Sequence, residues 1–203
     1  MDRKIVFIFV SIALVCILCT PVWSQDSAES EPLIAYSKGD QNFILNGGLF
    51  MPLFFLSTGG DYSGALEKTG PGITGSISWL SFLDNRFSLG FEFGGSYSST
   101  LSKRTFLMIP VLGKIGYSFV NYPFEIPLSL GVGIDFVKLD EMYTTTAVFK
   151  PEAGFYWNWR SEWAFGANVA YWFVPEIYFS EELRNQSMFG NFLDIRFSVL
   201  YHF

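Results

Sequence analysis

Residues 86–99 read RFSLGFEFGGSYSS, and in this stretch apolar residues alternate with small or polar ones at almost every step. The apolar positions are Phe87, Leu89, Phe91, Phe93 and Tyr97, and the positions between them are Ser88, Gly90, Glu92, Gly94, Ser96 and Ser98. Successive side chains of a β-strand point to opposite faces, so a period of two residues predicts a strand. This strand would have one face of large apolar side chains and one small, polar face.

The same alternation occurs in seven other segments, at residues 43–55, 72–82, 105–119, 124–137, 145–157, 163–173 and 192–203. No helical spacing, long repeat or second linker interrupts them, which predicts a single all-β domain. Proline cannot donate a hydrogen bond to a β-ladder, and Pro151 falls in the middle of its segment. Residues 145–157 are therefore the least regular of the eight predicted strands.

Composition indicates which face of these strands points outward. The 203-residue chain is 50% hydrophobic and 19% aromatic but only 16% charged, with 23 Phe and 19 Gly. The interior of an eight-stranded barrel is only just wide enough for side chains to fill it, so the many large residues cannot all point inward. A two-sheet sandwich would expose Ser and Gly instead of the charges that keep soluble sheets apart. The predicted fold is therefore all-β: a closed antiparallel eight-stranded up-and-down transmembrane β-barrel, with its large residues facing lipid.

The first 24 residues predict a secretory signal peptide. A basic start (MDRK) precedes an apolar stretch (IVFIFVSIALVCILC) and a polar end (TPVWS), with cleavage expected near Ser24. An uncleaved membrane anchor is the alternative, and lipidation of Cys16 or Cys19 is a weaker one because a large residue precedes each. Cleavage would leave no cysteine in the mature chain, which would exclude disulfides, thiolate metal sites and a cysteine nucleophile.

The remaining residues divide into a leader and a barrel. Residues 25–41 are polar, acidic and without periodicity, which predicts a flexible periplasmic leader, and residues 42–203 form the predicted barrel. The formal charge of -6 and the lack of clustered Lys and Arg argue against nucleic acid as a partner.

The connections between the predicted strands alternate in length. Those expected on the periplasmic side are short (DNR at 84–86, VNYP at 120–123, NWRSE at 158–162), and most of those expected outside are longer (residues 57–71, 99–104, 138–145 and 175–188). Tryptophans gather near the short turns, where an aromatic girdle would meet the membrane interface. The girdle candidates are Trp79, Trp157, Trp159 and Trp163, and the alternative is that they are ordinary strand aromatics.

Three stretches resemble the small eight-stranded outer-membrane barrels of the OmpX, OmpW and OmpA-barrel group: IPVLGKIGYSF (109–119), PFEIPLSLGVGIDF (123–136) and the terminal FSVLYHF (197–203). The resemblance implies a bacterial outer-membrane barrel over residues 42–203, with membrane lipids, periplasmic chaperones and the barrel-assembly machinery as partners. It also implies that this machinery reads the last strand as its assembly signal, through Phe197, Val199, Tyr201 and Phe203.

The inward face of the predicted barrel carries charges of both signs. We expect a lumen network formed by Glu92, Lys114, Asp135, Lys150, Glu152, Asn168, Asp194 and Arg196. Charges inside a narrow barrel must be paired or remain hydrated. The network would therefore be either a structural plug of salt bridges or a gate whose pairs exchange partners to pass water, ions or a small solute.

An enzyme is not expected, because the only histidine, His202, lies beside the C-terminus and away from any outer-rim catalytic group. No cofactor or metal site is expected either. The predicted function is membrane integrity with restricted passage of ions or small solutes. The alternative is an adhesin-like surface protein that binds an unknown extracellular ligand through its loops, in particular the acidic, aromatic loop at 175–188.

Overall fold

A computed structural model describes residues 36–57, 62–64, 70–99, 105–176 and 188–203. The chain divides into two compact units, Met1–Glu31 and Pro32–Phe203. The predicted signal peptide and most of the predicted leader lie outside the described residues, so both stay predictions.

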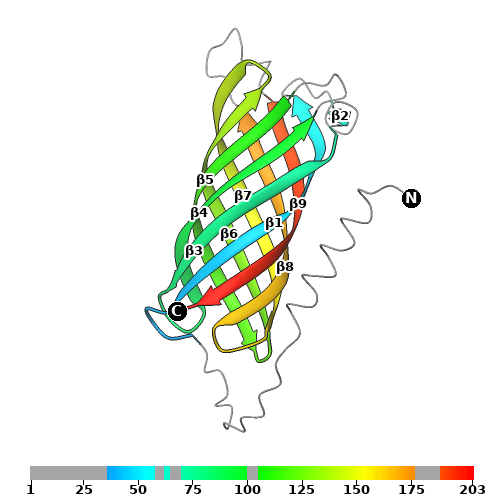
Figure 1. The fold of residues 1–203 in the computed structure, drawn as a ribbon. Helices are drawn as coiled ribbons and strands as arrows, with labels where there is room; N and C mark the ends of the chain where they lie inside the picture. The colour runs from blue at the N-terminus through cyan, green and yellow to red at the C-terminus, as the bar shows by residue number, and fades with distance from the viewer. Residues whose placement is uncertain (1–35, 58–61, 65–69, 100–104, 177–187) are drawn as a thin grey trace, which may run out of the picture. The chain divides into compact units, whose positions relative to one another are not determined.

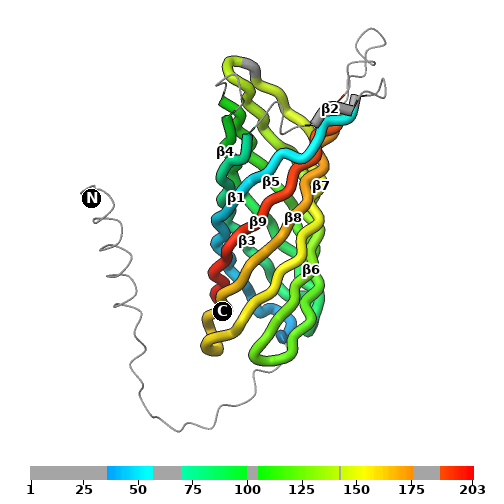
Figure 2. The backbone as a smooth tube through the Cα atoms, turned by 90° about the vertical axis from the view of Figure 1, so that its right-hand side faces the viewer, coloured from blue at the N-terminus to red at the C-terminus, as the bar shows by residue number. Residues whose placement is uncertain are grey.

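The described residues of the second unit form nine antiparallel strands, of which eight are long. Their bounds are β1 Gln41–Ser57, β2 Tyr62–Gly64, β3 Gly72–Phe82, β4 Phe87–Ser99, β5 Thr105–Asn121, β6 Phe124–Leu139, β7 Met142–Asn158, β8 Trp163–Glu176 and β9 Met188–His202. The long strands pair in sequence order, and β9 pairs back onto β1 from Asn42↔His202 to Ser57↔Met188. β1 and β9 lie side by side in the ribbon of Figure 1 and in the backbone tube of Figure 2. The predicted closed eight-stranded up-and-down barrel is thus confirmed.

The ninth strand, β2, was not predicted. The ladder between β1 and β3 ends at Phe50↔Gly72, and β2 continues it by pairing with residues 54–56 of β1. This short strand therefore lengthens the barrel wall within the first long connection.

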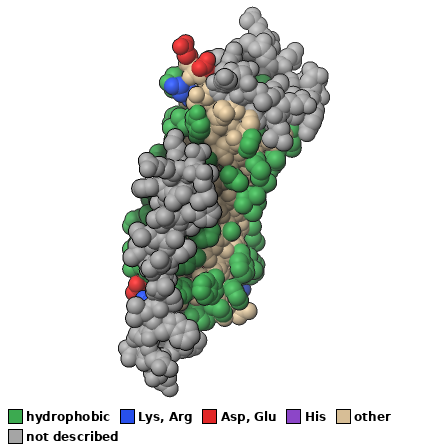
Figure 3. All heavy atoms as spheres, turned by 45° about the vertical axis from the view of Figure 1, so that its right-hand side comes forward, with side chains coloured by type: hydrophobic (Ala, Val, Ile, Leu, Met, Phe, Trp, Pro, Cys, Tyr) green, Lys and Arg blue, Asp and Glu red, His purple; other side chains and the backbone are tan. Residues whose placement is uncertain are grey.

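Large side chains line the outside of the barrel, as the alternation predicts. In β4, buried and exposed residues alternate, and Phe91 on the outer face is 57% exposed. Figure 3 shows hydrophobic side chains along the visible wall, with most charged side chains near the two ends. The eight long strands contain 11 to 17 residues, whereas about 9 to 11 are enough to cross a bilayer. No helix in the described part of the chain is long and apolar enough to span a membrane.

The barrel has two different ends. We call one the turn end: it carries Phe203 and the short connections at residues 83–86, 122–123 and 159–162. We call the opposite end the loop end. A long loop was expected there at residues 138–145, and this prediction is wrong. β6 and β7 continue to a two-residue turn at Asp140–Glu141, where Asp140 adopts a φ of 60° that Asp tolerates better than most residues.

Proline interrupts the ladders without breaking the strands. β7 runs through Pro151, but its pairing with β8 is missing between Phe149↔Phe173 and Glu152↔Ala170 while the register is kept. Pro110 similarly falls in a gap of the β4–β5 ladder, and Pro52 precedes a bulge in the β1–β9 ladder. Each proline therefore removes local hydrogen bonds on one side of its strand, which is where its missing N–H would have been used.

The boundary between the leader and the barrel also differs from the prediction. β1 begins at Gln41, and residues 36–40 pack on the turn end. The Gly39 N–H donates to the Phe82 carbonyl at 2.9 Å, and the Phe82 N–H donates to the Asp40 carbonyl at 2.8 Å. The last residues of the predicted leader are therefore part of the folded barrel.

Candidate functional site

Six charged side chains meet in the middle of the barrel. They come from four strands: Glu92 on β4, Lys114 on β5, Lys150 and Glu152 on β7, and Asp194 and Arg196 on β9. All six occupy inward positions of their strands, because each is flanked by residues that point out of the barrel. We call these six residues the ion network.

Glu92 is fully buried and accepts charge-assisted bonds from three cations. Its carboxylate oxygens lie 2.8 Å from Lys114 Nζ, 2.7 Å from Lys150 Nζ and 3.4 Å from Arg196 Nη1. The pairing of Glu92 with Lys114 joins neighbouring strands, whereas the other two contacts cross the interior. Glu92 thus links three strands of the barrel wall to its own.

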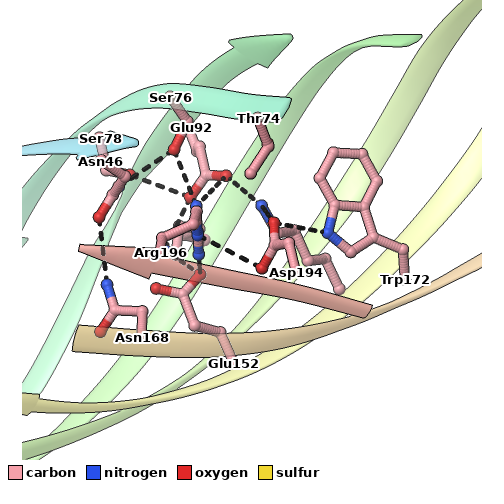
Figure 4. Close-up of polar contacts among 12 residues, drawn as sticks. Asn46, Thr74, Ser76, Ser78, Glu92, Glu152, Asn168, Trp172, Asp194 and Arg196 are labelled. Carbon is pink, nitrogen blue, oxygen red and sulfur yellow. Dashed lines mark hydrogen bonds and ion pairs between the residues drawn. The ribbon is translucent and has the colours of Figure 1, made fainter. Parts of the chain in front are cut away.

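Arg196 holds the other two carboxylates. Its Nη2 lies 2.5 Å from Glu152, and its Nε lies 3.4 Å from Asp194 (Figure 4). Lys114 also contacts Glu152 at 3.0 Å, and Lys150 contacts Asp194 at 3.5 Å. The network therefore contains three cations and three anions. Buried charges are destabilising unless they are paired in this way.

Neutral polar groups complete the layer around the charges. Arg196 Nη1 donates to the Ser76 hydroxyl at 2.8 Å, and the Ser78 hydroxyl donates to Glu92 at 3.0 Å. These serines face inward because small residues alternate with large ones along β3. They supply hydrogen bonds where a larger side chain would not fit.

Two of the eight predicted network residues lie outside the ion pairs. Asn168 was expected in the charged network, but its amide nitrogen donates to Asn46 Oδ1 at 3.1 Å and to the Tyr156 hydroxyl at 2.7 Å. Asp135 is fully buried, and no ion pair joins it to another described residue. The interior is also less polar than expected.

A layer of apolar side chains covers the ion network toward the loop end. Phe50 stacks on Phe192 with ring centroids 5.1 Å apart and meets Trp172 edge-on at 5.7 Å. The fully or almost fully buried members of this cluster are Phe50, Phe106, Met108, Leu112, Val148, Ala170, Trp172, Val174 and Phe192. Sequence reasoning missed it because the prediction placed only small and charged residues inside, although all of these residues occupy inward positions.

A second apolar layer lies toward the turn end. It consists of Ile44, Leu80, Tyr156, Ala164 and Leu200. On β1, the inward residues run from Ile44 through Asn46 to Phe50, so the polar layer lies between the two apolar ones.

Trp172 connects the ion network to the apolar layer above it. Its indole N–H donates to Asp194 at 2.9 Å, and Lys150 Nζ lies 4.2 Å from its ring centroid. Replacing Trp172 with phenylalanine keeps an aromatic ring but removes the donor, so Asp194 loses a hydrogen bond to a charged acceptor.

We expect Trp172→Phe to lower the free energy of unfolding by about 1.5–3 kcal/mol. Urea unfolding of the refolded protein, followed by heat-modifiable migration on gels, measures this loss. Trp163→Phe is the control, because Trp163 lies on the outer face against Tyr201. Equal urea midpoints for the two variants would contradict the assigned hydrogen bond.

The structure places all four predicted girdle tryptophans at the turn end with exposed side chains: Trp79, Trp157, Trp159 and Trp163. Phe203, which is 61% exposed, joins this ring of aromatic side chains by stacking on Trp79 at 6.0 Å. Of the predicted assembly-signal residues, Phe197 is 64% exposed, and Val199 and Tyr201 share its outward face of β9. Phe203 and the girdle tryptophans therefore form one aromatic surface at the turn end, and Phe197 extends the outward face of β9 toward the middle of the barrel.

A polar cluster at the turn end was missed by the sequence reasoning. It contains Tyr36, Asn42, Glu125, Asn158 and His202, and it borders a cavity of about 250 Å³. Burial, followed by the neighbouring Glu125 carboxylate, raises the pKa of Tyr36 above its usual value. No group of three or more His, Cys, Asp or Glu side chains in the described ranges is arranged to hold a metal ion. Only the inward parity of Asn42, Asn158 and His202 could have indicated this cluster.

A family model and two sequence relatives match this chain. A protein-family model matches residues 24–201. One uncharacterized protein of Treponema pallidum (strain Nichols) is 26% identical over an alignment of 127 residues and matches 63% of this chain. A second uncharacterized protein of the same organism is 24% identical over an alignment of 180 residues and matches 78% of this chain. The matches span 57% and 61% of those relatives, so the chain covers about three fifths of their length.

Solved structures share the fold at low sequence identity. Neisserial surface protein A matches 81% of this chain and 97% of its own, with a TM-score of 0.59 and 10% identity. OprG from Pseudomonas aeruginosa matches 83% of this chain and 98% of its own, with a TM-score of 0.50 and 11% identity. Ail, the attachment invasion locus protein of Yersinia pestis, in complex with the heparin analogue sucrose octasulfate, matches 82% of this chain and 99% of its own, with a TM-score of 0.50 and 11% identity. The chain therefore belongs to the family whose model covers residues 24–201, and its fold is that of the small eight-stranded outer-membrane barrels.

Proposed function

We propose that this protein is an integral barrel of a bacterial outer membrane whose lumen is closed, and that it contributes to membrane integrity without conducting ions at rest. The observation that carries the proposal is the paired ion network between two apolar layers. The outward aromatic and aliphatic side chains support insertion in a bilayer, since an exposed apolar belt of this extent would aggregate in water. The fold shared with outer-membrane barrels supports the location.

Passage through the lumen would require several interactions to break together. An ion would have to separate charges such as Glu92 and Lys150, 2.7 Å apart, and then pass the stacked rings of Phe50 and Phe192. Separating one partner of a buried pair leaves an unpaired charge in a medium of low dielectric constant, which is strongly unfavourable. The arrangement therefore favours a plug over a gate.

Single-channel recording tests this proposal. We expect the refolded protein to give no conductance steps in a planar lipid bilayer, while an open porin in the same bilayer serves as the positive control. Trp172→Ala removes part of one apolar layer but leaves the six charges, so it should also be silent. Steady conductance steps in the wild-type protein that change amplitude in Glu92→Gln would overturn the plug and support a gate.

The remaining roles rest on the surfaces at the two ends. The exposed side chains of Phe197 on β9 and of Phe203, the residue after it, are available to the barrel-assembly machinery, which supports the proposed assembly signal. Binding through the loops stays a prediction, since most of residues 175–188 lie outside the described residues.

A further inference from the structure

Residues 37–40, directly before β1, form a defined turn against the turn end of the barrel. The Asp40 carboxylate accepts a hydrogen bond from the Ser37 N–H at 2.7 Å, and Gly39 adopts a φ of 101°, which a residue with a side chain rarely adopts. Two backbone hydrogen bonds join this turn to Phe82 at the end of β3. The segment therefore has a defined conformation on the turn end.

Tyr36 directs its side chain from this turn toward the mouth of the barrel. Its ring stacks on Phe82 with centroids 3.6 Å apart and an interplanar angle of 13°. Its hydroxyl donates to Glu125 on β6 at 2.7 Å and accepts from Asn42 Nδ2 on β1 at 3.0 Å. The same hydroxyl lies 3.3 Å from His202 Nδ1 on β9. One side chain thus contacts four strands.

Two of these strands, β1 and β9, form the seam that closes the barrel. His202 Nδ1 lies 2.9 Å from Asn42 Oδ1 across the seam, and its Nε2 lies 3.2 Å from Asn158 on β7. The Phe203 N–H donates to the Gln41 carbonyl at 2.9 Å as the last backbone bond of the seam. Because Asn42 and His202 come together only when β9 has paired with β1, the full set of Tyr36 contacts exists only in the closed barrel.

We infer that residues 36–40 act as a clasp that locks the β1–β9 seam at the turn end once the barrel has closed. Tyr36 and Asp40 of the clasp also line the turn-end cavity, and the Tyr36 hydroxyl donates to Glu125, a carboxylate that is only 1% exposed. Across the described ranges, no ion pair involves Glu125. Opening the clasp would leave this buried group with one hydrogen bond fewer, which is unfavourable.

Amide hydrogen exchange of the refolded full chain in detergent micelles tests the clasp. Tyr36→Ala removes the ring and the hydroxyl, so the seam amides of Gln41 and Phe203, and the Phe82 amide that bonds to Asp40, should exchange at least about tenfold faster through local opening. Tyr36→Phe keeps the stacking on Phe82 and should give a smaller increase. The amide of Asp140, which bonds to Thr105 at the loop end, should not change.

Tyr143→Phe is the matched control, since Tyr143 is 75% exposed and lies at the loop end. Heat-modifiable migration confirms that each variant is a folded barrel before exchange is measured. Unchanged seam rates in Tyr36→Ala would overturn the clasp. An equal acceleration of Asp140 and Phe203 would also overturn it, because the loss of Tyr36 would then weaken the whole barrel and not the seam.

Discussion

Replacing Arg196 with methionine is expected to lower the free energy of unfolding by about 3–5 kcal/mol, the usual effect of breaking a buried ion pair from one side. Methionine retains much of the length and apolar volume of arginine, so the change acts mainly on charge. It leaves Glu92, Glu152 and Asp194 facing only Lys114 and Lys150. One buried negative charge is then without compensation.

Urea or guanidinium unfolding in lipid vesicles measures this loss. Arg86→Met is the control, because Arg86 lies in an exposed turn and its guanidinium donates to the Tyr117 hydroxyl on the barrel surface. The double variant Arg196→Met with Glu152→Gln restores equal numbers of cations and anions. It should be more stable than the sum of the single losses by about 0.5–3 kcal/mol. Strict additivity of the two losses would show that Arg196 and Glu152 are not coupled.

Alanine at Gly48 is expected to prevent most of the protein from closing into a barrel. A Cβ atom at this position of β1 would lie 2.1 Å from the Ile195 carbonyl oxygen and 2.6 Å from the Arg196 Cα on β9. Both are backbone atoms, so neither can turn away as a side chain could, and the seam itself would have to shift. Overpacking usually lowers the free energy of unfolding by about 1–3 kcal/mol. A clash with backbone atoms in the β1–β9 ladder should cost at least the upper end of this range.

Gly47 is a matched control for this substitution, because a Cβ atom there would have no neighbour within 4 Å. The yield of the heat-modifiable folded form after refolding separates the two variants. We expect Gly47→Ala to refold like the wild type and Gly48→Ala to remain largely in the unfolded form. Similar yields for both would mean that β1 and β9 are further apart than described.

Alternation predicted the strands, and the apolar composition turned them into a transmembrane barrel, because strands that face lipid keep one parity apolar along their length. The prediction from alternation failed at turns and at the start of the barrel, where individual residues decide the backbone conformation. Residues 138–145 carry charges typical of a loop, yet Asp140 closes a two-residue turn and the β-branched Thr144, Thr145 and Thr146 extend β7. Similarly, nothing periodic in residues 36–40 indicates that they fold against Phe82.

The site was predictable in composition but not in its pairing. Hairpin register brings Glu92 close to Lys114, whereas the bonds from Glu92 to Lys150 and Arg196 join residues 58 and 104 positions apart across the interior. Such contacts depend on the diameter and stagger of the closed barrel, which residue spacing does not reveal. The same holds for Asn168, whose partner Asn46 lies 122 residues away. The inward aromatic layer was missed for a different reason: the rule that large residues face lipid has exceptions at Phe50, Trp172 and Phe192.

The ion network has a consequence for how the chain could enter a bilayer. Glu92 and Lys114 belong to one hairpin, Lys150 and Glu152 to one strand, and Asp194 and Arg196 to another. Each of these three pairs contains one cation and one anion. Inserting the strands one pair after another would therefore never leave the inserted part of the ion network with a net charge in the hydrocarbon. Stepwise insertion of hairpins would then require only that the ions exchange local partners for those across the lumen as the last strand arrives.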